Sequence, residues 1–215
     1  SSAASDVYKR QIIRGATLIN GNGSPPLGPV DIVIEQNIIK SIRNVGYPGV
    51  DINESKRPKL SKKGREIDAE GMYVLPGFID MHGHIGGSSQ GAEPDYVFKL
   101  WLGHGITTVR EPGGRGIDYS IDLKNKSNNN QIVAPRLIIY SRFGSGFDKE
   151  ITSPEIAREW VRYNAKKGAD GIKFFGADPS IMKAALEENN KLGLGSAMHH
   201  AQLNVARWNV LPVSY

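Results

Sequence analysis

The sequence predicts an α/β protein, a partial (β/α)8 barrel of about five strands that follows a small β-rich domain. Two observations predict this fold. Up to position 75, short β-branched stretches alternate with turn residues, whereas later each apolar strand leads through a glycine loop to an amphipathic helix. A complete barrel of this kind takes roughly 250 residues. The second part of this 215-residue chain therefore holds about five of the eight strands.

The first part, residues 12–75, is expected to form a small sheet or sandwich (a composite β domain). A strand over residues 12–19 ends in a turn rich in glycine and asparagine. Two further strands, 31–35 and 38–42, flank a two-residue connection and predict a tight hairpin. Such a small set of strands needs a larger neighbour against which to pack.

In the second part, residues 76–211, strands and helices alternate. Ser153 is a good N-cap before Pro154, and Gly168 ends that helix. Alternation of this kind favours a parallel sheet with helices outside it. The expected strands are 77–82, 106–110, 136–140, 171–175 and 194–199, and the expected helices are 94–103, 153–168, 178–193 and 203–211.

The two ends of the chain look foreign to the fold. Residues 6–11 and 212–215 match translated sequencing-adaptor sequence, so we expect tails at 1–11 and 212–215 and a gene that continued on both sides. The localisation is therefore left open between the cytoplasm and, if a signal peptide preceded the fragment, the periplasm or the exterior.

Composition excludes several classes of function. The chain has no cysteine, which excludes disulfides and thiolate metal sites and leaves His, Asp, Glu or a modified side chain as ligands. No window holds the roughly 18 apolar residues of a membrane span. The net charge of +5 comes largely from the run 56–65, which has six basic residues and no interleaved aromatics. We interpret this run as a solvated loop rather than a polyanion patch, and expect no nucleic-acid partner.

Four of the five histidines fall at the predicted carboxyl ends of strands, where barrel enzymes place their active sites. His82 and His84 are expected to point to one face of a strand with Gly83 opposite, which makes half of a metal site. Asp80 lies one step back as a further ligand or as a carboxylate that orients His82. His199 and His200 are adjacent, so only one of them can face the site.

Lys173 lies in a strand that is otherwise apolar. An unpaired ammonium group there is costly, so its pKa falls or it needs a partner. A neutral lysine amine can react with carbon dioxide to form a carbamate, an anionic ligand with two oxygens that can bridge two metals. A lysine that simply reaches solvent from a strand end is the ordinary alternative.

Four motifs in order and at suitable spacing resemble the amidohydrolase superfamily, in its imidazolonepropionase and prolidase-like branch. VLPGFIDMHGHIG at 74–86, led by EIDAEG at 66–71, resembles the first barrel strand, and GHGITTVRE at 103–111 resembles the second. GADGIKFFG at 168–176 resembles the strand with the metal-bridging lysine, and GLGSAMHHA at 193–201 resembles the fifth strand. The resemblance covers residues 12 to 211.

The resemblance implies a metal-dependent hydrolase of carbon–nitrogen bonds in an amide, cyclic amide or dipeptide. His82 and His84 would bind one metal, Lys173 as a carbamate would bridge, and His199 (alternatively His200) would bind the second, with two Zn2+ in the full-length protein. The family's sixth-strand histidine and catalytic acid–base aspartate lie beyond position 215, so the fragment is expected to be inactive. A mononuclear-metal deaminase and a non-catalytic structural homologue are the alternatives.

The expected partners are a small-molecule or dipeptide substrate and, optionally, a second copy of the chain. Glu111, Tyr140 and Arg142 follow the second and third strands and are candidates for contact with substrate at the mouth of the barrel. An open sheet of five strands with an unpaired edge and an apolar inner face is expected to oligomerise or aggregate.

Overall fold

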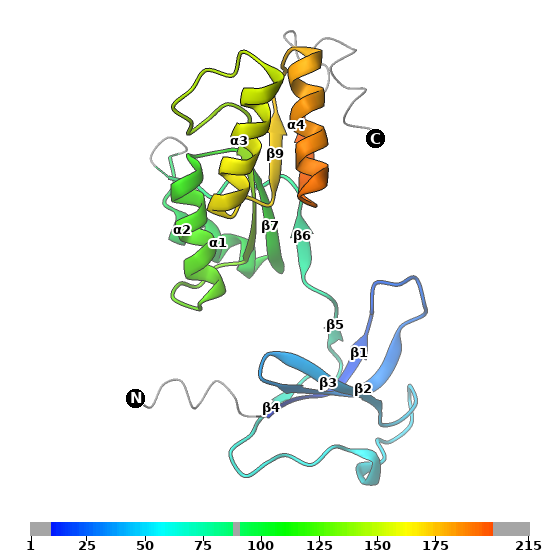
Figure 1. Cartoon of the computed structure of the whole chain (residues 1–215). Helices are drawn as coiled ribbons and strands as arrows, with labels where there is room; N and C mark the ends of the chain where they lie inside the picture. The colour runs from blue at the N-terminus through cyan, green and yellow to red at the C-terminus, as the bar shows by residue number, and fades with distance from the viewer. Residues whose placement is uncertain (1–9, 88–90, 200–215) are drawn as a thin grey trace. The chain divides into compact units, whose positions relative to one another are not determined.

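A computed structural model describes residues 10–87 and 91–199 (Figure 1). The chain divides into two compact units on either side of the Pro76–Gly77 bond. Within the described ranges, no helix combines the length and apolar character needed to cross a membrane. The expected helix 203–211, His200 and most of the expected tails lie outside the described residues.

The first unit is built on one five-stranded sheet in the order β3-β2-β1-β4, with β5 also paired to β1. Its first three strands are antiparallel neighbours, and the two short ones run parallel to β1. All described strands of this unit belong to that single sheet, so the second layer of a sandwich is not formed among them. The elements are β1 (Gln11–Leu18), β2 (Leu27–Glu35), β3 (Ile38–Asn44), the 3-10 turn η1 (Glu54–Lys56), β4 (Arg65–Asp68) and β5 (Tyr73–Val74).

The hairpin expected between the second and third strands is present. Gln36 and Asn37 have φ angles of 50° and 63°, the left-handed conformation that a two-residue hairpin turn of this kind requires. At the start of β1, Gln11 pairs with both neighbouring strands and the side chain of Arg10 donates a hydrogen bond to Glu35. The domain boundary expected at residue 12 therefore falls inside β1.

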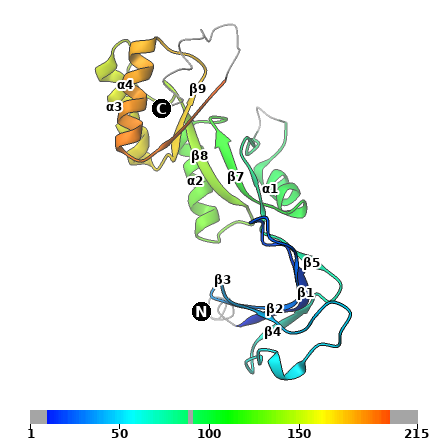
Figure 2. The ribbon, with the colours of Figure 1, turned by 90° about the vertical axis from the view of Figure 1, so that its right-hand side faces the viewer.

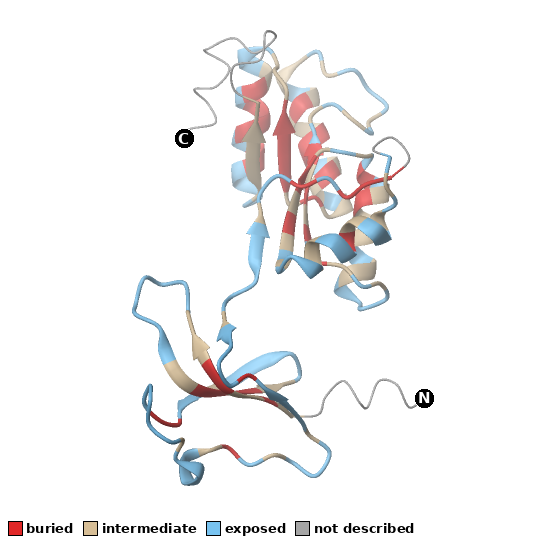
Figure 3. Ribbon diagram, turned by 180° about the vertical axis from the view of Figure 1, so that it is seen from behind, coloured by how far each residue is buried: buried red, intermediate tan, exposed pale blue. Residues whose placement is uncertain are grey.

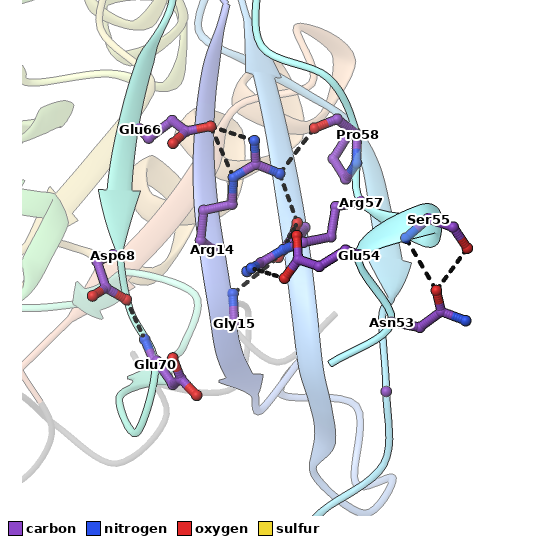
Figure 4. A network of polar contacts seen from close by, with 12 residues as sticks. Arg14, Gly15, Asn53, Glu54, Ser55, Arg57, Pro58, Glu66, Asp68 and Glu70 are labelled. Carbon is purple, nitrogen blue, oxygen red and sulfur yellow. Dashed lines mark hydrogen bonds and ion pairs between the residues drawn. The ribbon is translucent and has the colours of Figure 1, made fainter. Parts of the chain in front are cut away.

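A network of polar contacts, which includes Arg14 and Arg57, joins the long β3–β4 connection to the sheet (Figure 4). Asp31 in β2 has no exposed surface and accepts hydrogen bonds from Arg14, Arg57 and the Gly15 amide. Burial alone would raise the pKa of Asp31, but these donors outweigh it and hold that pKa below its usual range. Arg57 is thus an internal partner, whereas the other basic residues of the run 56–65 are exposed, as a solvated loop requires.

The second unit is a curled parallel sheet in which spatial order equals chain order, β10-β9-β8-β7-β6. A doubly wound sheet would reverse its order at a switch point, so this winding is that of a half-barrel. The elements are β6 (Phe78–Asp80), α1 (Pro94–Gly103), β7 (Ile106–Pro112), α2 (Ile117–Asn128), β8 (Arg136–Arg142), α3 (Pro154–Lys167), β9 (Gly171–Phe174), α4 (Pro179–Lys191) and β10 (Gly195–Met198).

Local signals explain where the helices begin and end. The Ser153 hydroxyl accepts a hydrogen bond from the Ile156 amide at the start of α3, and Gly168 closes that helix with φ of 102°. Helix α2 was not expected from the sequence. It has few apolar residues, and Ile117 and Ser120 are its only buried ones, so its hydrophobic periodicity is weak.

The two faces of this sheet differ in character. Val109, Leu137 and Phe174 point to the face that the helices cover, where they pack with residues such as Phe98 and Trp160. Helices α3 and α4 lie side by side along β9 (Figure 1, Figure 2), and β9 is buried over its whole length (Figure 3). The other face is the inner face of the half-barrel.

The inner face is more polar than expected. It carries Arg110 on β7, Tyr140 and Arg142 on β8, and Lys173 on β9, which alternate with the helix-facing residues of the same strands. The expectation of an apolar inner face is therefore corrected, because long cationic and phenolic side chains occupy it.

Candidate metal centre

His82 and His84 lie in the loop that follows β6, and not within the strand as expected, because the strand ends at Asp80. The loop still continues along β7, since the Gly83 amide donates to the Arg110 carbonyl oxygen at 3.1 Å. The Asp80 carboxylate accepts a hydrogen bond from the backbone amide of His82 at 2.9 Å. Asp80 thus holds the backbone of this loop rather than the imidazole of His82.

Gly83 is required between the two histidines. A Cβ at this position would lie 2.6 Å from a methyl carbon of Val109 and 2.7 Å from the indole of Trp101. Because the backbone of Gly83 packs directly on the helix-covered side, the flanking His82 and His84 are displaced to the other side. Their ring centres lie 5.4 Å apart.

Glu111, the acidic residue near the end of β7, orients His84. Its side chain is 1% exposed, and one oxygen lies 2.8 Å from His84 Nδ1. The same carboxylate accepts hydrogen bonds from the amides of Ile85 at 2.6 Å and Gly114 at 2.7 Å. Since a carboxylate accepts, Nδ1 carries the proton, and Nε2 of a neutral His84 presents its lone pair. The Glu111 carboxylate is buried behind His84, and the substrate contact expected for it from the sequence stays a prediction.

Lys173 is 2% exposed in the middle of the sheet. No carboxylate lies within ion-pair distance of its ammonium among the residues that the structure describes. Burial, followed by the nearby positive charge of Arg110, lowers the pKa of Lys173. Both effects favour the neutral amine.

His199 follows β10, at the opposite end of the sheet order from β6, and lies close to His82. Its ring centre lies 6.1 Å from that of His82, in a stacked arrangement, and 4.5 Å from that of Phe175. The ring centre of Phe175 also lies 5.7 Å from the Lys173 ammonium nitrogen. Burial lowers the pKa of His82, and the neighbouring cationic groups, led by Lys173, lower it further. The alternative ligand, His200, lies outside the described residues.

The donor set suits divalent metal ions in kind. Three imidazoles and a buried amine from three separate strand ends are brought together, and neutral imidazole is the form that binds metal. In the described part of the chain, no three His, Cys, Asp or Glu side chains form a group close enough to hold a metal ion by themselves. A complete cage therefore depends on Lys173 or on residues outside the described ranges.

The remaining substrate candidates occupy different levels of the inner face. The Tyr140 side chain lies across Gly171 and Gly195. An added Cβ would lie 2.7 Å from its ring at Gly171 and would clash with its hydroxyl oxygen at Gly195, so Tyr140 fills the inner face at a level below Lys173. Arg142 ends β8, and its guanidinium carbon lies 4.8 Å from the centre of the Phe175 ring. Arg110 lies over the Tyr140 ring at 5.0 Å.

Sequence reasoning missed two contributors to this site. Phe175 contacts His199, Lys173 and Arg142, but one more aromatic residue in an apolar strand gave no signal. The orienting role of Glu111 had a weak signal, since an acidic residue directly after a buried strand end needs a partner.

Relatives with curated functions cover part of the chain, and no family model matches it. A dihydroorotase from Thermoanaerobacter sp. (strain X514) is 42% identical over 124 residues, which is 58% of this chain and 24% of that protein. Adenine deaminase 2 from Desulfotalea psychrophila is 34% identical over 102 residues, 41% of this chain and 17% of that protein. The chain therefore spans about a quarter or less of these two relatives.

Solved structures match nearly the whole chain. A Xaa-Pro dipeptidase with bound methionine superimposes with a TM-score of 0.72 at 21% identity, over 95% of this chain and 59% of that one. A putative prolidase from Bifidobacterium longum gives 0.75 at 22% identity, over 95% and 53%. These likenesses show the fold, and the curated relatives are amidohydrolase-superfamily proteins. The resemblance to the amidohydrolase superfamily predicted from the sequence is thus confirmed in both sequence and fold.

Proposed function

We propose that this chain is part of a metal-dependent hydrolase that cleaves a carbon–nitrogen bond in an amide, a cyclic amide or a dipeptide. One observation carries the proposal. His82, His84 and His199 gather at one end of a parallel sheet beside Lys173, a buried amine without an acidic partner among the described residues. Barrel enzymes build their active sites from residues at the carboxyl ends of several different strands, and these four residues have that arrangement.

In this proposal His82 and His84 hold one divalent ion, and His199 holds a second. Glu111 keeps the Nδ1 proton on His84, so that Nε2 is the ligand atom. Asp80 fixes the backbone between the strand and His82. The two carboxylates therefore support the ligands from behind.

Lys173 supplies the anionic ligand after modification. Its neutral amine nitrogen bonds to the carbon of carbon dioxide, one proton leaves to solvent, and a carbamate with two oxygens results. Burial and the Arg110 charge favour the amine, which is the reactive form. When bound, two zinc ions would polarise the scissile carbonyl and lower the pKa of a coordinated water.

The chain alone is expected to be inactive. Near the histidines the described carboxylates are Asp80 and Glu111, and both hold backbone amides. Neither is placed to move a proton between water and the leaving nitrogen, a role that the resemblance assigns to an aspartate after position 215.

Metal analysis of the full-length protein that contains this chain, expressed with zinc and bicarbonate, tests the proposal. We expect about two ions per chain in the parent and a loss of at least one in Lys173→Ala, while Lys166→Ala, an exposed lysine of α3, keeps both. A 13C carbamate resonance after labelling with bicarbonate should disappear in the same variant. One ion that survives the change would favour a mononuclear deaminase, and no bound metal would refute the proposal in favour of a non-catalytic homologue.

A further inference from the structure

We propose that the inner face of the half-barrel contains an anion-binding subsite built on Arg142, with Arg110 as the second cation. The substrate would then be an acid whose carboxylate lies on this subsite while its amide carbon lies at the histidines. The position of the amide carbon at the histidines rests on the proposed function, whereas the anion-binding subsite does not, because it can bind an anion without any metal.

Arg142 is exposed at the end of β8. An aromatic ring supports its side chain, but no described carboxylate neutralises its charge. Its guanidinium lies over Phe175, with the carbon 4.8 Å from the ring centre. Among the described residues, no acceptor receives a hydrogen bond from this guanidinium, and no carboxylate lies within 4.0 Å of it. Stacking on an aromatic ring leaves the planar N–H donors at its edge free for a ligand, which is the geometry that binds a carboxylate through two hydrogen bonds.

The same ring connects Arg142 to the candidate metal ligands. Phe175 lies 4.5 Å from the His199 ring and 5.7 Å from the Lys173 ammonium nitrogen. The guanidinium and the imidazole thus contact one side chain, so a molecule the size of an amino-acid amide can reach both.

Arg110 adds a second positive charge on the neighbouring strand. Its Nε donates to the Met81 carbonyl oxygen at 2.7 Å, and the guanidinium lies over the Tyr140 ring at 5.0 Å. As with Arg142, the described residues provide no carboxylate within ion-pair distance of this guanidinium.

Charge balance favours an anion on this face. Arg110 and Arg142 lie on the adjacent strands β7 and β8, and the nearby carboxylates of Asp80 and Glu111 are already engaged by backbone amides. A carboxylate makes two charge-assisted hydrogen bonds with a guanidinium, and these are roughly twice as strong as the bonds that a neutral amide oxygen accepts. The subsite would therefore select acids over neutral amides.

A pair of probes that differ only in charge tests this inference. N-acetylglycine and N-acetylglycinamide are titrated into the 15N-labelled 215-residue chain, with and without zinc, and the shifts of amide signals are followed. We expect the acid to bind at least tenfold more tightly than the amide. Arg142→Gln should abolish that preference, and Arg142→Lys should keep only part of it.

Arg136→Gln is the matched control, because Arg136 is an exposed arginine at the opposite end of the same strand. It removes the same charge and should leave the preference intact. Equal binding of the two probes by the parent chain, or an unchanged preference in Arg142→Gln, would overturn the subsite. Acid binding by the 215-residue chain without zinc would support the subsite even if the full-length protein bound no metal, so the two failures are distinguishable.

Discussion

Replacement of Glu111 by glutamine should weaken zinc binding although Glu111 itself touches no metal. The carboxylate accepts three hydrogen bonds, from His84 Nδ1 and the amides of Ile85 and Gly114, at 2.6–2.8 Å. A glutamine has one accepting oxygen and one NH2 group. If the oxygen stays with His84 and Gly114, the NH2 group faces the Ile85 N–H, and a buried donor loses its acceptor.

The magnitude follows from these contacts. One buried N–H left without an acceptor costs about 1–3 kcal/mol of the free energy of unfolding. The neutral amide oxygen also holds the His84 proton less firmly than a carboxylate does, and loss of such an orienting partner typically weakens metal binding by about 10–100-fold. We therefore expect both effects together.

Zinc affinity is measured by competition with a chromophoric chelator, and stability is measured by urea unfolding followed by circular dichroism. Glu93→Gln is the control, since Glu93 precedes α1, is exposed and makes no capping hydrogen bond with its side chain. A Glu111→Gln chain that binds zinc within threefold of the parent affinity would refute the orienting role.

Three further predictions concern packing and pH. Gly83→Ala forces a Cβ to within 2.7 Å of Trp101, so it should lower the free energy of unfolding by about 1–3 kcal/mol and reduce zinc binding, whereas Gly103→Ala, with open space around it, should do neither. Tryptophan fluorescence during urea unfolding measures the stability, and competition with the chelator measures the zinc affinity. Asp31→Ala removes the buried acceptor that Arg14, Arg57 and the Gly15 amide share, and it should cost the first unit about 1–3 kcal/mol, measured by hydrogen exchange of β1 amides. Because the pKa of Asp31 is lowered in the folded protein, its contribution to the free energy of unfolding should be complete above the unfolded pKa of about 3.9 and should decline as the pH falls through the folded pKa. The stability of the first unit should therefore fall more in acid than that of Asp31→Asn, and equal losses of hydrogen-exchange protection in the two chains would contradict this.

The elements with strong local signals could be predicted from the sequence. Helix α3 has a serine cap, a proline at its first turn and a terminal glycine, and each of these acts within a few residues. Strand β9 is short, apolar and flanked by glycines. By contrast, α2 forms because its few apolar residues meet β8, and such a tertiary contact leaves little trace in the local pattern.

The candidate site could be predicted only in part. The motif around His82 and His84 identified them as candidate ligands, but the end of β6 at Asp80 depends on pairing with β7, which a local pattern does not contain. The partnership of Glu111 with His84 joins residues 27 positions apart. The polar inner face was missed because Arg142 was assigned to the loop after its strand and Arg110 to the last position of its strand, whereas β7 continues to Pro112 and β8 to Arg142.

The Tyr140 ring lies over two glycines, Gly171 and Gly195, on neighbouring strands. The three positions share one fixed volume, so a change at one constrains the others during evolution. Relatives with a larger residue at position 195 should carry a smaller one at position 140, and an engineered Gly195→Ala chain should regain stability when Tyr140 is shortened to alanine. The width of the inner face at this level would then be inherited as a set of three residues rather than one at a time.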